Sequence, residues 1–215
     1  DLNLALANAG YDFITDAATS GRASDGRVSG GWDLGDWTTG TMGCGTGNSS
    51  WHGTHVAGSI GAVGNNTGGV VGINWTTSIM ALKFMDADGN GYVSDAINAI
   101  EFALQVKQTF AATGEANIRI LNNSWSGGGF SQALQDEIAR AASADMLFVA
   151  SAGNNGLDHE VTPGFPSDYS GGNVVSVAAT DYRDQLGSFS DYGAQHVHIG
   201  APGVLIYSTT WSQTT

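Results

Sequence analysis

The sequence predicts an α/β fold of three layers, in which a mostly parallel sheet has helices on both faces. Two observations favour this fold. Short apolar runs typical of strands alternate along the chain with longer segments whose apolar residues recur about every 3.6 positions. Several of the short runs are continuously apolar, as the strands of a parallel sheet are when helices cover them. Because strands that alternate with helices usually pair in parallel, the order of elements favours a single covered sheet.

The first quarter of the chain is different in character. Residues 16–50 are polar and rich in glycine, which predicts a long surface excursion with little regular structure. The next stretch, residues 51–62, reads Trp-His-Gly-Thr-His-Val-Ala-Gly-Ser-Ile-Gly-Ala. Side chains this small let a helix approach other backbone closely. We therefore expect a buried helix that carries His52 at its tip.

The remaining elements alternate regularly. Apolar runs predict strands at residues 79–84, 118–122, 146–150 and 174–178. Helical spacing of apolar residues predicts helices at residues 94–110 and 132–144, and Ser131 is the expected N-cap of the second.

Composition excludes several classes of partner. Acidic residues outnumber basic ones by 20 to 7, and the net charge is −13, which argues against nucleic acid or an anionic membrane as a partner. No apolar run approaches the length of about 18 residues that predicts a membrane-spanning helix. The single cysteine, Cys44, has no second cysteine with which to pair in this sequence, so we expect a free thiol.

Two polar residues stand where chemistry could use them. His52 could act as a general base that takes a proton from a nucleophile. Asn154 follows the apolar run 146–150, and its amide could donate a hydrogen bond to a developing oxyanion without titrating. Each residue also has a structural interpretation, as a hydrogen-bonded buried histidine or as an asparagine that caps a turn. A metal site on His52 and His55 is a third alternative, although zinc needs a third protein ligand and the sequence supplies none nearby.

Taken together, the motifs resemble those of the subtilisin-like serine proteases, the subtilases. The resemblance rests on the segment around His52, on Ser-Ala-Gly-Asn at residues 151–154 and on Asn-Asn-Ser-Trp-Ser at residues 122–126, and it extends through Gly-Ala-Pro-Gly-Val at residues 200–204. It implies a secreted, monomeric serine endopeptidase that cleaves polypeptides through an acyl-enzyme. In that mechanism His52 would be the catalytic base, Asn154 would bind the oxyanion, and His55 would be structural.

The resemblance also implies where a peptide binds. One edge would be residues 88–92, including Gly89, Asn90 and Gly91, and the peptide would lie between this edge and the glycine-rich segment 124–128 as an added strand. The other residues expected to contact substrate are Ser124, Trp125, Ser126, Gly127, Ser151, Ala152, Gly153 and Gly164. None of these side chains is charged, which predicts a specificity pocket for large apolar residues. Relatives commonly have glycine where this chain has Ser126, and the Phe165–Pro166 bond is a candidate cis peptide.

A structural Ca²⁺ is the one cofactor that the resemblance implies. Residues 64–73 resemble a calcium-binding loop of the subtilases, in which Asn66 would donate its side-chain oxygen and Gly64, Gly68 and Val70 their carbonyls. Asp1 matches a calcium-binding aspartate of the family. Carbonyl and amide oxygens suit this hard cation. The alternative for residues 64–73 is an ordinary turn.

Two of the three residues of a subtilase triad are not found in the sequence. The family's catalytic aspartate precedes the residues that match Asp1, and its nucleophile lies in Gly-Thr-Ser-Met-Ala, which does not occur here. The resemblance therefore implies that residues 1–215 are a partial catalytic domain, incomplete at both ends. It would lack the strand with the catalytic Asp and the helix with the nucleophilic Ser, and it would be inactive alone. The alternative from another functional class is a non-catalytic subtilase-like binding domain.

Overall fold

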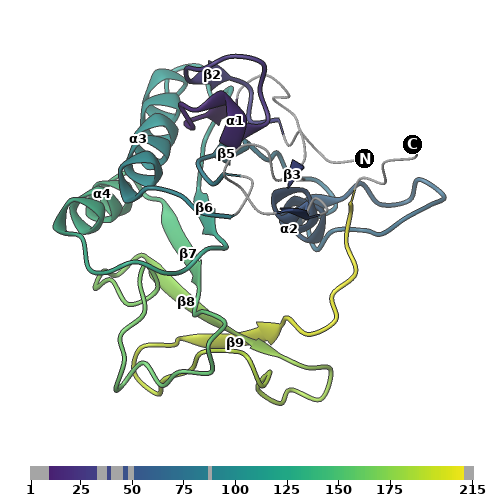
Figure 1. Ribbon diagram of the computed structural model, residues 1–215, viewed down its shortest axis with the longest axis vertical. Helices are drawn as coiled ribbons and strands as arrows, with labels where there is room; N and C mark the ends of the chain where they lie inside the picture. The colour runs from purple at the N-terminus through teal and green to yellow at the C-terminus, as the bar shows by residue number, and fades with distance from the viewer. Residues whose placement is uncertain (1–9, 33–37, 40–45, 48–50, 87–88, 211–215) are drawn as a thin grey trace. The chain divides into compact units, whose positions relative to one another are not determined.

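The computed structural model describes residues 10–32, 38–39, 46–47, 51–86 and 89–210 (Figure 1). These residues divide into two compact units. The first contains the described residues up to Ala99 together with those from Tyr207 onward, and the second contains Ile100–Ile206. Each unit is built around its own sheet.

The sheet of the second unit has four strands, all parallel, in the order β6-β7-β8-β9. The strands are β6 (Ile120–Asn123), β7 (Leu147–Ser151), β8 (Val174–Thr180) and β9 (Ile199–Pro202). Burial alternates along β7, where Phe148 and Ala150 are fully buried and Leu147 is exposed. The parallel sheet predicted from the sequence is confirmed for β6, β7 and β8, and β9 is a strand that the apolar runs did not predict.

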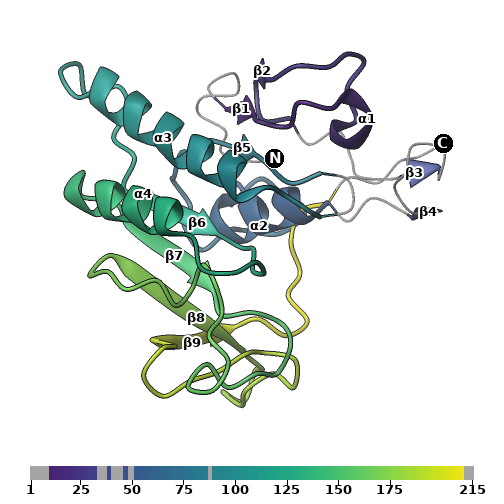
Figure 2. The ribbon, with the colours of Figure 1, turned by 60° about the vertical axis from the view of Figure 1, so that its left-hand side comes forward.

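Two long helices lie side by side next to this sheet (Figures 1 and 2). They are α3 (Val93–Thr109) and α4 (Gln132–Ser143), within one residue of the predicted bounds. Ser131 caps α4 as predicted, because its Oγ accepts a hydrogen bond from the Leu134 N–H at 3.4 Å. Leu134, Ile138 and Ala141 recur at helical spacing and bury one face of α4 in the core.

The helix pair leaves a shallow apolar groove between its carboxyl-terminal turns. Residues of both helices, such as Leu104 and Arg140, line a hollow of about 440 Å³ together with Ala111 and Ala144, which follow the two helices. Lys107 closes the end of α3: its Nζ donates to the carbonyls of Ile118 at 2.7 Å and Asp145 at 3.2 Å. Burial lowers the pKa of Lys107 from its usual value, because a charged amine is poorly solvated there.

Apart from the beginning of α3, which lies before Ala99, the described elements of the first unit are short. Its three-stranded sheet has the order β2-β1-β5, with β1 (Tyr11–Asp12) parallel to β5 (Leu82–Lys83) and antiparallel to β2 (Val28–Ser29). A second pair joins β3 (Thr38–Thr39) to β4 (Thr46–Gly47), and the helices are α1 (Ala17–Ser20) and α2 (His52–Gly61). The described part of residues 16–50 contains only α1 and the two-residue strands β2 to β4, which agrees with the prediction of little regular structure. The strand predicted at 79–84 is shorter than expected, because β1 offers it two residues with which to pair.

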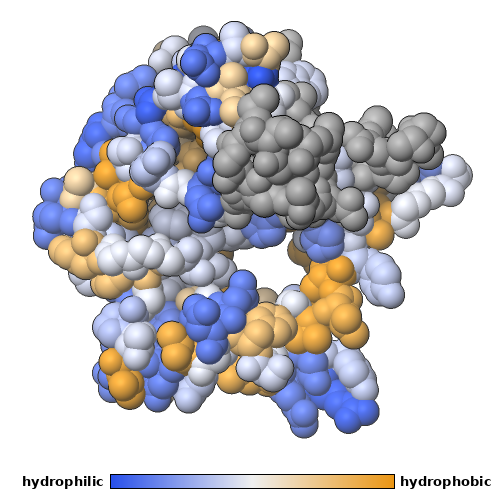
Figure 3. All heavy atoms as spheres, in the orientation of Figure 1, coloured by the Kyte–Doolittle hydropathy of each residue, from blue (hydrophilic) through white to orange (hydrophobic). Residues whose placement is uncertain are grey.

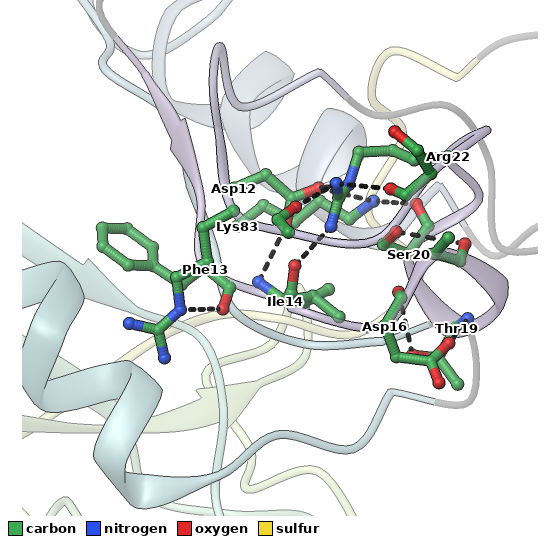
Figure 4. A network of polar contacts seen from close by, with 12 residues as sticks. Asp12, Phe13, Ile14, Asp16, Thr19, Ser20, Arg22 and Lys83 are labelled. Atoms are coloured by element: carbon green, nitrogen blue, oxygen red, sulfur yellow. Dashed lines mark hydrogen bonds and ion pairs between the residues drawn. The ribbon is translucent and has the colours of Figure 1, made fainter.

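A buried carboxylate organises this sheet (Figure 4). Asp12 is almost fully buried, and its Oδ2 lies 3.1 Å from Arg22 Nε and 3.7 Å from Lys83 Nζ. Its Oδ1 accepts from the Ile14 N–H at 2.9 Å. Arg22 also donates to the carbonyls of Ile14 and Gly26, so one guanidinium fixes the loop between β1 and β2. We call Asp12, Arg22 and Lys83 the Asp12 cluster.

The visible surface is mostly hydrophilic, with separate apolar patches (Figure 3). Exposed large apolar residues occur in both units, such as Ile73, Tyr182 and Leu205. No helix in the described part of the chain combines the length and apolarity needed to cross a membrane.

Candidate active site

His52 is the first residue of α2. Trp51 precedes it with a left-handed backbone (φ 52°), so the chain turns sharply into the helix, and His52 lies exposed at the tip. Side chains approach the helix closely at Gly58, where an added Cβ would lie 2.1 Å from Thr209 Oγ1. The predicted close approach of backbone is confirmed at the end of the helix, where a Cβ added to Gly72 would lie 2.5 Å from Gly61 Cα. Ser208 Oγ donates to the His55 carbonyl at 2.6 Å, which ties the first turn of α2 to the segment that follows Tyr207. The small residues thus let other backbone hold the helix that carries His52.

Asn154 lies three residues beyond β7, in a loop whose backbone is held on both sides of it. The Gly153 carbonyl accepts from the Asp191 N–H at 3.0 Å. Asp191 Oδ1 accepts from the N–H groups of Asn155 at 2.7 Å and Leu157 at 2.9 Å. Asn154 itself is exposed. The structure therefore presents this amide from a fixed loop at the carboxyl end of a parallel strand, where α/β proteins place their sites.

Three of the segments predicted to bind substrate meet within the second unit. Ser151 Oγ donates to the Trp125 carbonyl at 3.3 Å, which joins the ends of β6 and β7. The Gly127 N–H donates to the Phe165 carbonyl at 3.1 Å, which joins the segment after β6 to the residue next to Gly164. Gly127 and Gly128 have φ values of 104° and 91°, a backbone that favours glycine. The cis Phe165–Pro166 bond is confirmed.

In the other predicted wall, the described residues 89–92 pair closely with residues 85 and 86. The Asp86 N–H donates to the Asn90 carbonyl at 2.7 Å, and Asp86 Oδ1 accepts from the Asn90 N–H at 2.9 Å. Gly91 forms an isolated antiparallel bridge with Met85, and Gly89 has a φ of 75°. Both backbone groups of Asn90 are thus paired inside the turn, which differs from the open edge expected for pairing with a peptide. Asp88 lies outside the described residues.

The predicted calcium loop encloses a small hollow. Asn66, Gly68 and Val70, three of the expected ligands, line a space of about 260 Å³ together with Ala62, Gly69 and Thr209. Left-handed backbone at Asn65 (φ 58°) and Thr67 (φ 69°) curls the loop, and the Gly72 N–H closes it onto the Ala62 carbonyl at 2.9 Å. The amide and carbonyl oxygens of this set suit Ca²⁺, although the lining residues include no carboxylate. Asp1, which would supply one, lies outside the described residues, as does Cys44.

The zinc alternative gains no support from the described part of the chain. No group of three or more His, Cys, Asp and Glu side chains in those residues is placed to hold a metal ion. His52 and His55 both lie on α2, and none of the described carboxylate, thiol or imidazole side chains completes a metal site with them.

One buried group was missed by sequence reasoning. His159 is 1% exposed, and its Nδ1 lies 2.8 Å from Asp168 Oδ1. Its Nε2 lies 3.6 Å from Asp191 Oδ2, the carboxylate that holds the Asn154 loop. We call His159, Asp168 and Asp191 the His159 cluster. Its members come from three separate segments without a common motif, so the only signal in the sequence was a histidine close to the predicted pocket residues.

The chain resembles proteases of known sequence and structure. The model of the subtilase family matches residues 26–215. An extracellular protease of Xanthomonas campestris pv. campestris is 37% identical over 210 residues, which are 96% of this chain and 35% of that protein. Subtilisin DY of Bacillus licheniformis is 35% identical over 164 residues, 76% of this chain and 55% of the subtilisin. This chain therefore spans between about a third and just over half of these two relatives.

A solved structure shows the same fold. It is a protease of Pseudoalteromonas arctica PAMC 21717, with a TM-score of 0.73 and 30% identity, and the match covers 90% of this chain and 56% of that one. The likeness confirms the predicted three-layer α/β class, including the parallel sheet built from β6 to β9.

Proposed function

Because the chain belongs to the subtilase family, we propose that it forms part of a secreted serine endopeptidase that cleaves polypeptides through an acyl-enzyme. In this proposal His52 is the base that takes the proton of the nucleophile and later returns it to the leaving amine. Asn154 donates its amide to the oxyanion, and the peptide lies along residues 124–127. The aspartate and the serine of the triad are expected elsewhere in the full-length protein.

The observation that carries this proposal is the fixed loop around Asn154. An oxyanion donor accelerates a reaction only when it is already in place before charge develops. Asp191 fixes the backbone on both sides of Asn154, while the side chain stays exposed. The relatives are named as proteases, and nothing in the comparisons favours the non-catalytic alternative.

We further propose that the specificity pocket accepts large apolar side chains before the cleaved bond. Its expected lining residues carry no charge that could pair with a buried Lys or Arg. Asp158 and Glu160 are the nearby carboxylates that could have attracted a basic side chain. Asp158 Oδ1 accepts from the Glu160 N–H at 3.0 Å. Glu160 Oε1 accepts from the Gln195 N–H at 2.6 Å, and Glu160 Oε2 lies 3.9 Å from His196 Nε2. Glu160 is thus engaged with residues 195–196.

The test of the catalytic proposal uses the full-length protein. His52→Ala should lower kcat by several orders of magnitude with little change in KM, since a base acts mainly in the transition state. Asn154→Ala should lower kcat about 10²- to 10³-fold, the range known for removing one such donor from a subtilisin. His55→Ala is the matched control, and it should act through stability alone. Equal loss of kcat in stable His52 and His55 variants would contradict the assignment, as would wild-type protein that resists a serine-directed phosphonate.

A structural calcium ion is the second part of the proposal. Asn66 and the carbonyls of Gly64, Gly68 and Val70 would hold it, with Asp1 as the carboxylate ligand, and the bound ion would supply rigidity to the loop that follows α2. Ca²⁺ should raise the melting temperature by mass action on the folded state. Asn66→Ala should reduce that gain, whereas Asn173→Ala, far from the loop in the sequence, should leave it unchanged. Identical melting curves in millimolar calcium and in chelator would rule out the site.

A further inference from the structure

The His159 cluster joins two segments that the proposed mechanism treats separately. Asp168 belongs to the segment that carries Gly164, the expected floor of the specificity pocket. Asp191 holds the loop that carries Asn154. The imidazole of His159 lies between the two carboxylates, at 2.8 Å from one and 3.6 Å from the other. The shorter contact is a buried hydrogen bond, which keeps a single arrangement because every alternative leaves one of the two groups without a partner. The longer contact is a close polar approach beyond hydrogen-bond length.

Asp168 fixes the position of the floor. Its Oδ2 accepts from the Gly164 N–H at 2.7 Å, and its Oδ1 faces His159 Nδ1. A carboxylate oxygen only accepts, so Nδ1 carries the proton of this hydrogen bond. The ring also packs directly against the floor, since a Cβ added to Gly164 would lie 2.7 Å from both Cε1 and Nε2 of His159. The imidazole therefore prevents Gly164 from moving further toward His159, which sets the depth of the expected pocket.

Asp191 fixes the oxyanion side in a comparable way. Its Oδ1 accepts two N–H groups of the Asn154 loop, and its Oδ2 faces His159 Nε2. A Cβ added to Gly153 would lie 2.1 Å from Asp191 Oδ2, so the carboxylate is pressed against the residue before Asn154. Hydrogen bonds that involve an ionised group are roughly twice as strong as neutral ones. The carboxylate thus holds the loop by its charge and by its shape.

We propose that His159 is a positioning residue, which through Asp191 and Asp168 holds the Asn154 donor and the Gly164 floor at a fixed spacing. The inference rests on the proposed function, because it assigns these two segments their roles. It predicts a division of labour: the contact of Nε2 with Asp191 governs kcat, and the contact of Nδ1 with Asp168 governs the choice of side chain before the cleaved bond. A displacement of about 1 Å in such a site can cost about 10²-fold in rate.

Two substitutions at the same position separate the two contacts. The amide nitrogen of asparagine can occupy the place of Nδ1, and that of glutamine the place of Nε2. His159→Asn should therefore keep the ranking of a peptide series varied before the cleaved bond and lower kcat about 10-fold or more. His159→Gln should keep kcat within about threefold and change the ranking. His159→Ala should both lower kcat and change the ranking. Asp191→Asn should lower kcat and keep the ranking, as His159→Asn does.

The measurements use the full-length protease, with active sites counted by a serine-directed phosphonate so that each kcat refers to folded enzyme. His198→Gln is the control: His198 is an exposed histidine of the same unit, its Nδ1 accepts from the Ser176 N–H at 2.9 Å, and the variant should keep the kcat and the ranking of wild type. The proposal is overturned if the His159 variants lose only melting temperature while kcat per active site and ranking stay within twofold of wild type. It is also overturned if Asn and Gln give the same pattern. Wild-type protein that cleaves no peptide would instead refute the proposed function, and the positioning role with it.

Discussion

The two units surround their buried carboxylates with different partners. The Asp12 cluster sets one carboxylate against two cations, Arg22 and Lys83. The His159 cluster places two carboxylates around one imidazole. Most of its other partners are backbone N–H groups, those of Gly164, Asn155 and Leu157, and the Ser167 hydroxyl lies 3.4 Å from Asp168 Oδ1. Cations on long side chains join segments at a point, whereas several backbone amides on one carboxylate determine the shape of a loop. The first arrangement suits a structural joint, and the second suits a site.

Removing the charge of Asp12 should give the largest effect on stability. Asp12→Asn leaves Arg22 and Lys83 beside a neutral group, and breaking a buried pair from one side costs about 3–5 kcal/mol. Asp16→Asn is the matched control: Asp16 is exposed, it caps α1 by accepting from the Thr19 N–H at 3.0 Å, and asparagine caps equally well. Urea denaturation of both variants gives the difference. A loss below about 1 kcal/mol for Asp12→Asn would show that the cluster is not a structural joint.

Crowding the His159 cluster should give a smaller loss of stability and a clear loss of activity. Gly153 has a φ of 132°, and its added Cβ would meet Asp191 at 2.1 Å. Gly153→Ala should therefore cost about 1–3 kcal/mol through backbone strain and overpacking. Gly172→Ala is the control, since no atom lies within 4 Å of its added Cβ and its backbone is ordinary. Equal unfolding free energies for the two variants would mean that the Asp191 carboxylate moves aside without cost, and that its packing against Gly153 does not fix the loop.

The smallest effects are expected where charges lie nearer the surface, between α3 and α4. Arg140 contacts both Glu101 and Glu137. Its hydrogen bond lowers the pKa of Glu101, whereas burial raises the pKa of Glu137 and outweighs the same arginine. Among the described residues, Glu137 Oε1 has no hydrogen-bond partner, which fits this direction.

The two glutamates should thus give opposite dependences on pH. A lowered pKa means that Glu101 stabilises the fold above its unfolded pKa, and this contribution is lost as pH falls through the folded pKa. A raised pKa means that charged Glu137 opposes folding at neutral pH, and this penalty is relieved on acidification. Glu101→Gln should lower the melting temperature slightly at pH 7, and Glu137→Gln should leave it unchanged or raise it. The difference in melting temperature between each variant and wild type should disappear as the pH falls from 7 to 3. A difference that stays constant over this range would contradict the assigned directions of the two pKa shifts.

Strong local patterns could be predicted from the sequence. α3, α4 and β7 lie within about one residue of their predicted bounds, because helical spacing or a continuous apolar run identified each of them. β9 could not be found in this way, since Ile199–Pro202 contains glycine and proline and is defined by its pairing with β8. The two-residue strands of the first unit depend likewise on partners distant in the chain.

The residues of the candidate site also differ in how far a local sequence pattern identifies them. His52, Asn154 and the glycine-rich segments stand in local motifs, so the sequence located them. The His159 cluster did not appear in any motif, because its geometry depends on three segments that meet only after folding. The closed turn at Asn90 was likewise invisible, since it depends on the side chain and backbone of Asp86. Candidate residues that stand in one local motif could therefore be chosen from the sequence, whereas the side-chain contacts of the His159 cluster could not.

The placement of the lysines has a practical consequence. Lys83 and Lys107 are the only lysines in the sequence, and they fall in different units. The amine of Lys83 donates to the Ser20 carbonyl at 2.6 Å beside Asp12, and that of Lys107 is bound to two carbonyls. An acylating reagent can react with each amine only after the hydrogen bonds to these partners break. The labelling rates of the two lysines, resolved by mass spectrometry, should therefore report the local opening of each unit separately within one molecule.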